Sequence, residues 1–140
     1  MSTEQADRSD AYEGDMLHAG AVIAVSDLAR ARAFYEGRLG LVGEETVGGW
    51  IVRAGGGSVL YLLVDDGAGT ATWPVASFRV TDLVGAVRAL RARGVPFLTQ
   101  GELTFTVDDD GIAHQDGMRV AWMRDPDGSI LTIFSIEGAG

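Results

Sequence analysis

Few side chains in this sequence could perform chemistry, and the two histidines are the first to consider. His18 and His114 are the only histidines of the chain, and no cysteine is present. Imidazole nitrogens bind divalent metals and act as acid–base groups near neutral pH. With an acidic residue such as Asp116, the two histidines could form a metal site if folding brings them together. Histidines that are only solvated or hydrogen-bonded are the simpler alternative. Disulfides, thiolate metal sites and cysteine nucleophiles are excluded.

Other catalytic patterns do not occur in the sequence. No serine stands in a nucleophile elbow, and neither histidine has an evident orienting partner. The glycine run 55–57 precedes a predicted strand, so it lacks the helix N-terminus that holds phosphate in a phosphate-binding loop. The sequence therefore indicates no standard nucleophile–base reaction.

Composition and charge restrict the class of protein. The chain has 140 residues, enough for one compact domain or for two small modules that share a sheet. Its net charge is −9, which argues against a nucleic-acid partner because phosphate contacts need a basic surface. No apolar run reaches the roughly 20 residues of a membrane span, and residues 1–15 lack the apolar core of a secretory signal. We expect a soluble cytoplasmic protein with no membrane partner.

The elements that would position a site come from an internal duplication. Val25-Ser26-Asp27-Leu28 and Val80-Thr81-Asp82-Leu83 lie 55 residues apart. Each motif follows a predicted strand, supplies an aspartate N-cap and opens a run of apolar residues at helical spacing. The predicted helices, 27–38 and 82–93, end near Gly40 and Gly94. A duplication in so short a chain restricts the fold to few options.

Short apolar runs separated by glycines predict the strands. In the first half they lie at 17–25, 42–47, 50–54 and 58–64, which gives the order β-α-β-β-β. The second half repeats this order with strands at 75–80, 97–103, 118–123 and 130–136. Asp125-Pro126-Asp127-Gly128 is a type I turn pattern, and residues 107–115 are interpreted as an acidic loop. The expected organisation is a flexible acidic tail (1–15) and a single domain (16–140), with module one at 16–64, a linker at 65–73 and module two at 74–137.

These motifs resemble those of a known superfamily. Val25–Leu28, the helix with Ala33-Phe34-Tyr35, the following Leu39-Gly40-Leu41 and the closing turn Arg124–Ser129 resemble the vicinal oxygen chelate superfamily. This group includes glyoxalases, bleomycin-resistance proteins and extradiol dioxygenases. The resemblance covers residues 17–137. It implies an α+β fold in which two tandem βαβββ modules form a curled mixed sheet with a cup-shaped cleft, and usually a homodimer. It does not imply one reaction, because one fold supports many functions.

The resemblance also implies where a metal would bind. Enzymes of the superfamily usually place a ligand seven residues before each helix-capping aspartate and a glutamate in the last strand. These positions hold Gly20, Val75 and Thr132 in this sequence. Glycine and valine have no ligating side chain, and a neutral threonine is a poor substitute for a carboxylate. We therefore expect no metal and no other cofactor, with His18, His114 and Asp116 as the remaining alternative.

Strand alternation predicts which side chains line the cup. His18 shares a face with Gly20, and Arg79 shares one with Val75. A buried Arg79 would need an anionic partner, either inside the protein or on a ligand. Large rings on or beside the strands suit a flat organic ligand, although each could instead pack in the core or at a dimer interface. The cup-facing candidates are His18, Trp50, Tyr61, Ser77, Arg79, Phe105, His114, Trp122, Thr132 and Phe134.

Three hypotheses about function follow. The leading one is a metal-free small-molecule-binding protein that sequesters an aromatic or cationic compound between two protomers, by resemblance to bleomycin-resistance proteins. The alternative is an enzyme of the superfamily, which would be a lyase or dioxygenase with non-standard metal ligands, or a metal-free acid–base catalyst that uses Arg79 and His18. The third is a partner-binding or regulatory domain. The missing ligands and the aromatic-rich strands favour the first.

Overall fold

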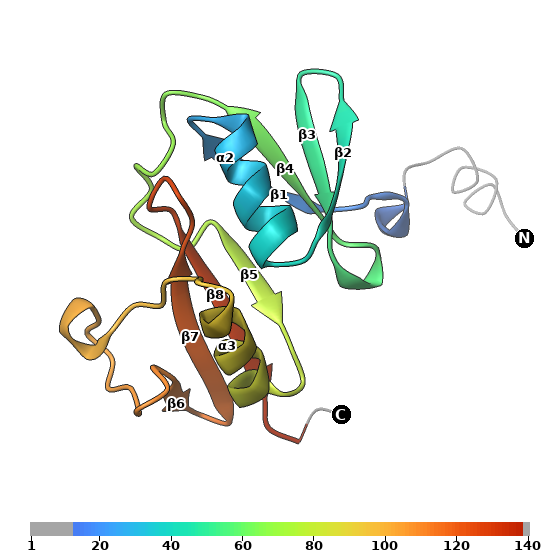
Figure 1. The fold of residues 1–140 in the computed structure, drawn as a ribbon. Coiled ribbons are helices and arrows are strands. Elements are labelled where there is room, and N and C mark those ends of the chain that lie inside the picture. The colour runs from blue at the N-terminus through green and yellow to red at the C-terminus, as the bar shows by residue number, and fades with distance from the viewer. Residues whose placement is uncertain (1–12, 139–140) are drawn as a thin grey trace, which may run out of the picture.

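The computed structural model describes residues 13–138, which form two βαβββ modules in sequence (Figure 1). Module one contains β1 (Gly20–Val25), α2 (Leu28–Arg32) with a π-helical continuation (Ala33–Arg38), β2 (Val42–Thr46), β3 (Gly49–Arg53) and β4 (Val59–Val64). Module two contains β5 (Ala76–Arg79), α3 (Leu83–Ala92), β6 (Ala113–Gln115), β7 (Met118–Arg124) and β8 (Ile130–Ile136). Single 3₁₀ turns occur at Gly14–Met16, Gly55–Gly57 and Gln100–Glu102. The predicted α+β class and two-module order are confirmed, whereas most of the predicted tail, residues 1–12, lies outside the described residues.

Each module has its own four-stranded mixed sheet. The strand orders are β1-β4-β3-β2 and β5-β8-β7-β6. The first strand of each module pairs in parallel with the last, as the crossover through α2 or α3 requires, and the other pairs are antiparallel. The two sheets remain separate rather than merging into one curled sheet. Each helix lies against one face of its sheet (Figure 1).

The helix boundaries follow from local chemistry. Asp27 Oδ1 accepts a hydrogen bond from Arg30 N at 3.0 Å, and Asp82 Oδ1 accepts one from Gly85 N at 3.0 Å. These are the predicted N-caps. Gly40 and Gly94 adopt φ of 77° and 85°, a left-handed conformation that ends a helix and favours glycine.

The core lies between the helices and the sheets. Ile23, Val87 and Leu131 are fully buried there. Adjacent Phe34 and Tyr35 are both buried, and their rings pack edge to face with centroids 5.0 Å apart. The π-helical pattern, with Leu39 N donating to Phe34 O at 2.9 Å, accompanies this burial. Within residues 13–138, no helix is long and apolar enough to cross a membrane.

One predicted strand is wrong. Residues 97–103 make only the isolated bridge between Phe97 and Met123, because Thr99 and Glu102 form a capping box that folds the chain into a 3₁₀ turn. The remaining strand of module two is β6, which lies inside the segment 107–115 that the sequence pattern favours as a loop. A tight turn with positive φ at Asp116 (47°) and Gly117 (78°) pairs β6 with β7. This Asp-Gly pair is a hairpin signal that the sequence analysis did not use.

The closing turn of module two holds the helix start of module one. Asp127 accepts hydrogen bonds from the backbone and hydroxyl of Ser26, and from Arg30 Nη2 at 2.8 Å. Asp125 is 4% exposed, and its Oδ2 accepts a hydrogen bond from the Tyr35 hydroxyl at 2.8 Å. Burial raises the pKa of the Tyr35 phenol and also the pKa of the Asp125 carboxyl. The two most recognisable motifs of the sequence therefore bind each other across the module junction.

Candidate functional site

Each sheet has one face covered by its helix and one uncovered face, here called the open face. On β1, Ile23 is buried and Val22 is 60% exposed. On β4, Leu62 is buried while Tyr61 and Leu63 are 37% and 43% exposed. The open face of module one therefore presents apolar side chains, which often mark a ligand-binding or protein-binding surface.

The open face of module two combines hydroxyl groups with aromatic rings. Ser77, Thr132 and Trp122 are neighbours in register across β5, β8 and β7. Thr132 Oγ1 donates a hydrogen bond to Ser77 Oγ at 2.7 Å. Arg79 and Phe134 form the next row, and Arg79 is exposed rather than buried as expected. Because β5 is the edge strand of its sheet, water reaches the Arg79 guanidinium and no buried counter-ion is required.

A loop residue enlarges this aromatic surface. The Phe105 ring stacks on Trp122, with centroids 5.4 Å apart and planes 11° from parallel. The Gln100 side chain holds the loop in place, because its Nε2 donates to Phe105 O at 2.8 Å and its Oε1 accepts from Val107 N at 2.8 Å. Phe105 remains 41% exposed, so it can contact a ligand. Gln100 was missed by sequence reasoning, since no local pattern signals a side chain that bridges two backbone groups five and seven residues away.

Trp50 lies on the helix-covered face, so its predicted position in the cup is wrong. The register pairs Ile51 with Tyr61, which places Ile51, and not Trp50, on the open face. Trp50 Nε1 donates to Glu36 Oε2 at 3.1 Å, and the Arg32 guanidinium lies 3.7 Å from the ring centroid. The hydrogen bond from Arg32 is the main cause that lowers the pKa of Glu36.

His114 also lies on the face opposite the expected one. Ala113 pairs with Val120, whose partner is Phe134, so Ala113 belongs to the open face and His114 points the other way. His114 Nε2 lies 3.0 Å from Asp108 Oδ2. Burial alone would raise the pKa of Asp108, but the hydrogen bonds from His114 and from two backbone N–H groups outweigh it and lower the pKa.

The alternative metal site is not assembled. His18 is exposed just before β1, His114 pairs with Asp108, and Asp116 lies in the β6–β7 turn. Among residues 13–138, no group of three histidine, cysteine, aspartate or glutamate side chains could hold a metal ion. Of the other candidates, Tyr61 lies on the open face of module one, and Ser77, Arg79, Phe105, Trp122, Thr132 and Phe134 lie on or over the open face of module two.

Comparison with known proteins agrees with this architecture. A family model described as the glyoxalase/bleomycin resistance protein/dioxygenase superfamily matches residues 16–133. The chain belongs to this superfamily. No curated protein matches the sequence.

Several solved structures are similar to this member of the superfamily. UcmS2 has a TM-score of 0.66 and 19% identity, covering 84% of this chain and 96% of that chain. A glyoxalase/bleomycin resistance protein from Catenulispora acidiphila DSM 44928 has a TM-score of 0.63 and 22% identity, covering 86% and 98%. Oxidase ChaP-H2 has a TM-score of 0.61 and 22% identity, covering 89% and 97%. At these identities the likeness establishes the fold and not a function.

The positions that the superfamily usually gives to metal ligands do not fit a metal ion in this chain. A Cβ added at Gly20 would lie 2.7 Å from Val59 O and 2.9 Å from the Tyr61 ring, so the space for a ligating side chain is already filled. Val75 has no donor atom, and the Thr132 hydroxyl is bonded to Ser77. A neutral hydroxyl with no carboxylate or imidazole beside it is a weak ligand set.

Proposed function

We propose that this chain is a small-molecule-binding protein that holds a flat aromatic compound on the open face of module two, with no metal at the superfamily's usual ligand positions. The stacked pair of Phe105 and Trp122 carries the proposal. Planar rings held in a fixed orientation favour stacking with a planar ligand at low entropic cost. Gln100 supplies that fixed orientation through its two backbone hydrogen bonds.

Polar groups beside the rings would determine orientation and selectivity. Ser77 and Thr132 offer hydroxyl groups in register with Trp122, and Arg79 lies one row away. Guanidinium binds carboxylate and phenolate oxygens well, so Arg79 favours an anionic substituent on the aromatic compound over a cationic one. Of the aromatic or cationic ligands expected from the sequence, this charge preference favours aromatic compounds and disfavours cationic ones.

We further propose a homodimer in which a second copy covers the open faces. Exposed apolar side chains occur on both open faces, including Leu63 in module one and Ile136 in module two, each above 40% exposed. A patch of this kind favours association with a self-complementary copy. A second copy would enclose the ligand and exclude water from the polar contacts.

A ligand screen tests the proposed function. We expect planar aromatic acids, screened with natural-product antibiotics in a thermal-shift assay containing EDTA, to include compounds that raise the melting temperature. The Trp122→Ala variant should bind such a compound about tenfold more weakly, which corresponds to roughly 1.4 kcal/mol. Trp73→Ala is the matched control, because Trp73 is 64% exposed in the segment between the modules. No stabilising compound together with turnover of a small substrate, or equal binding by both variants, would contradict the proposal.

A further inference from the structure

The two modules differ where they meet, although each element has a counterpart in the other module. Alignment of the capping residues Asp27 and Asp82 makes Phe34 and Tyr35 correspond to Ala89 and Leu90. Alignment of the strand pairs Arg53–Val59 and Arg124–Ile130 superimposes the two turns. In the turns, Asp125 and Pro126 correspond to Ala54 and Gly55. Aromatic or polar residues on one side of the junction are thus matched by smaller apolar ones on the other.

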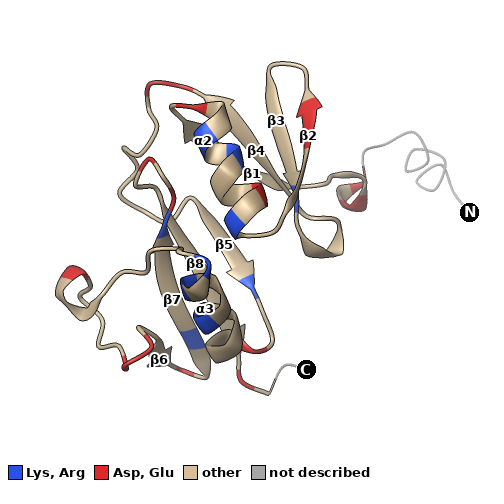
Figure 2. Cartoon of the chain, viewed as in Figure 1, with Lys and Arg blue, Asp and Glu red and all other residues tan. Residues whose placement is uncertain are grey.

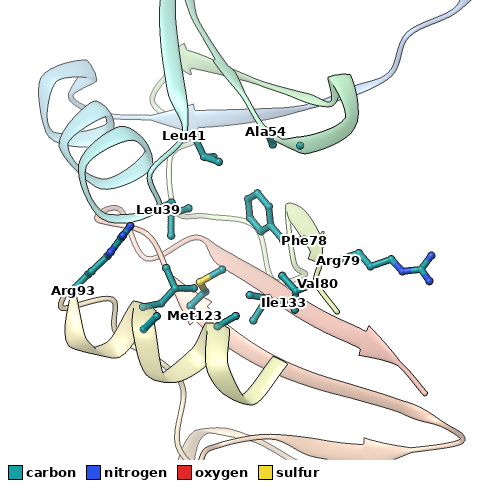
Figure 3. A pocket seen from close by; sticks show the side chains of 13 residues that line it. Leu39, Leu41, Ala54, Phe78, Arg79, Val80, Arg93, Met123 and Ile133 are labelled. Carbon is teal, nitrogen blue, oxygen red and sulfur yellow. The ribbon is translucent and has the colours of Figure 1, made fainter. Parts of the chain in front are cut away.

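On the module one side, the corresponding space between helix and turn is a pocket of about 390 Å³ whose lining includes the larger or charged groups Phe34, Arg38 and Asp125. Phe34 and Tyr35 are 4% and 0% exposed, and Tyr35 reaches Asp125 at 2.8 Å. On the module two side, a cavity of about 330 Å³ lies between α3, β5, the end of the module one helix and the turn at 54–55, and its lining is more apolar (Figure 3). Its apolar wall is formed by Leu39, Leu41, Phe78, Leu90, Met123 and Ile133.

The size and polarity of this cavity suit a small organic molecule. Small-molecule pockets commonly range from about 300 to 1,000 Å³, so the cavity is at the small end of that range. An apolar cavity of about 150 Å³ is already large enough for benzene. A ligand of one aromatic ring with a short side chain therefore matches the available volume.

A single cationic group marks the rim. Figure 3 shows Arg79 directed away from the other lining side chains, whereas Arg93 lies next to Leu39 at the edge of the cavity. Arg93 Nη1 donates to Arg38 O at 3.3 Å, and a guanidinium carries five N–H donors, so this contact engages only part of the group. Basic residues occur along the length of both helices, while acidic residues lie mainly in loops and at the end of β2 (Figure 2). An anionic head group complements the charge of Arg93.

We propose that the inter-module cavity is a second ligand site, separate from the open faces, that binds a single-ring aromatic carboxylate with its ring against Phe78 and Met123 and its carboxylate at Arg93. This proposal does not depend on the function proposed for the open face. The two sites lie on opposite faces of module two, since Met123 and Trp122 are adjacent on β7 and point in opposite directions.

Methionine methyl groups allow the two sites to be told apart. Met123 lines the cavity, and Met118 lies on the open face of the same strand, 40% exposed. We expect 3-phenylpropionate, added to the full chain labelled with ¹³C at the methionine methyl groups, to shift the Met123 signal and leave the Met118 signal in place. The neutral 3-phenylpropanol should bind about tenfold more weakly, and the cationic 3-phenylpropylamine more weakly still.

Two variants with one control complete the test. Ala89→Phe introduces the ring found at the corresponding Phe34 and should abolish the Met123 shift, whereas Ala92→Phe, which is on the same helix outside the cavity, should retain it. Arg93→Gln should remove the preference for the carboxylate over the alcohol. A shift at Met118 alone, equal binding by Ala89→Phe, or equal affinity for acid and alcohol would overturn the proposal.

Discussion

Tyr35 and Asp125 form the most deeply buried polar contact between the modules. The Tyr35 hydroxyl donates to Asp125, and Asp125 Oδ1 also accepts from the backbone N–H groups of Asp127 and Ser129. Removal of the Tyr35 hydroxyl would leave the buried carboxylate with incomplete hydrogen bonding. The free-energy cost of such an unsatisfied buried group exceeds the net contribution of a typical hydrogen bond to stability. The contact therefore contributes to stability even though burial of the carboxylate is unfavourable.

Tyr35→Phe should lower the free energy of unfolding at pH 7 by about 1–3 kcal/mol, measured by urea denaturation. Because burial and the nearby Asp125 raise the pKa of folded Tyr35 above its unfolded value of about 10, its contribution is complete below that pH. It is lost as pH rises further, since the unfolded chain then releases a proton that the folded chain retains. The difference between wild type and Tyr35→Phe should therefore shrink above pH 10. Tyr61→Phe, on the open face, is the control, and an identical loss in both variants would contradict the assignment.

Gly20 shows at the same scale why a metal ligand cannot be restored by one substitution. Gly20→His should destabilise the fold by about 1–3 kcal/mol, because its Cβ would meet Val59 and Tyr61 at 2.7–2.9 Å. Gly14→His is the matched control, since nothing lies within 4 Å of a Cβ there. Thermal melts with and without added Zn²⁺ or Mn²⁺ provide the measurement. Metal-dependent stabilisation of Gly20→His would show that the site can accept a ligand after all.

At the scale of elements, turns and loops position both the junction and the candidate site. Helices, most strands and both N-caps could be predicted from sequence because their signals are local: an aspartate, an apolar period and a terminal glycine. The 3₁₀ turn at Gln100–Glu102 could not, because the apolar residues of 97–103 suit a strand while Thr99 and Glu102 favour a cap. The faces of Trp50 and His114 depend on register, which is fixed by the pairing of Ile51 with Tyr61 and of Ala113 with Val120. The alternation of side chains along one strand does not reveal how that strand is aligned with its neighbours.

Gln100 holds the loop that carries Phe105 in place over Trp122. Gln100→Ala removes both hydrogen bonds that hold the loop, so Phe105 should lose its fixed orientation over Trp122. We expect affinity for an aromatic ligand of the open face to fall several-fold, with a smaller change in melting temperature than in affinity. Gln115→Ala removes a comparable amide from β6 and serves as the control. Titration followed by tryptophan fluorescence measures the effect, and unchanged affinity in Gln100→Ala would contradict a positioning role.

At the scale of the whole molecule, the open faces determine how copies of the chain would associate. Leu63 of β4 lies among apolar neighbours on the open face, whereas Val47 is fully exposed at the tip of the β2–β3 hairpin. Leu63→Glu should shift the protein from dimer to monomer in light-scattering measurements, because the charge would be buried in the proposed interface. Val47→Glu adds the same charge elsewhere and should leave the dimer intact. A wild-type chain that is monomeric at all concentrations would contradict the proposed homodimer.

We propose that this member of the superfamily binds its ligand without a metal at the usual positions. Calorimetric titration of the protein with an aromatic acid from the screen, before and after exhaustive chelation and with the metal content measured in each sample, tests it most directly. We expect equal affinity in both samples, no stoichiometric metal in either, and a loss of about tenfold in Trp122→Ala. Binding that disappears on chelation and returns with one equivalent of a divalent metal would contradict it.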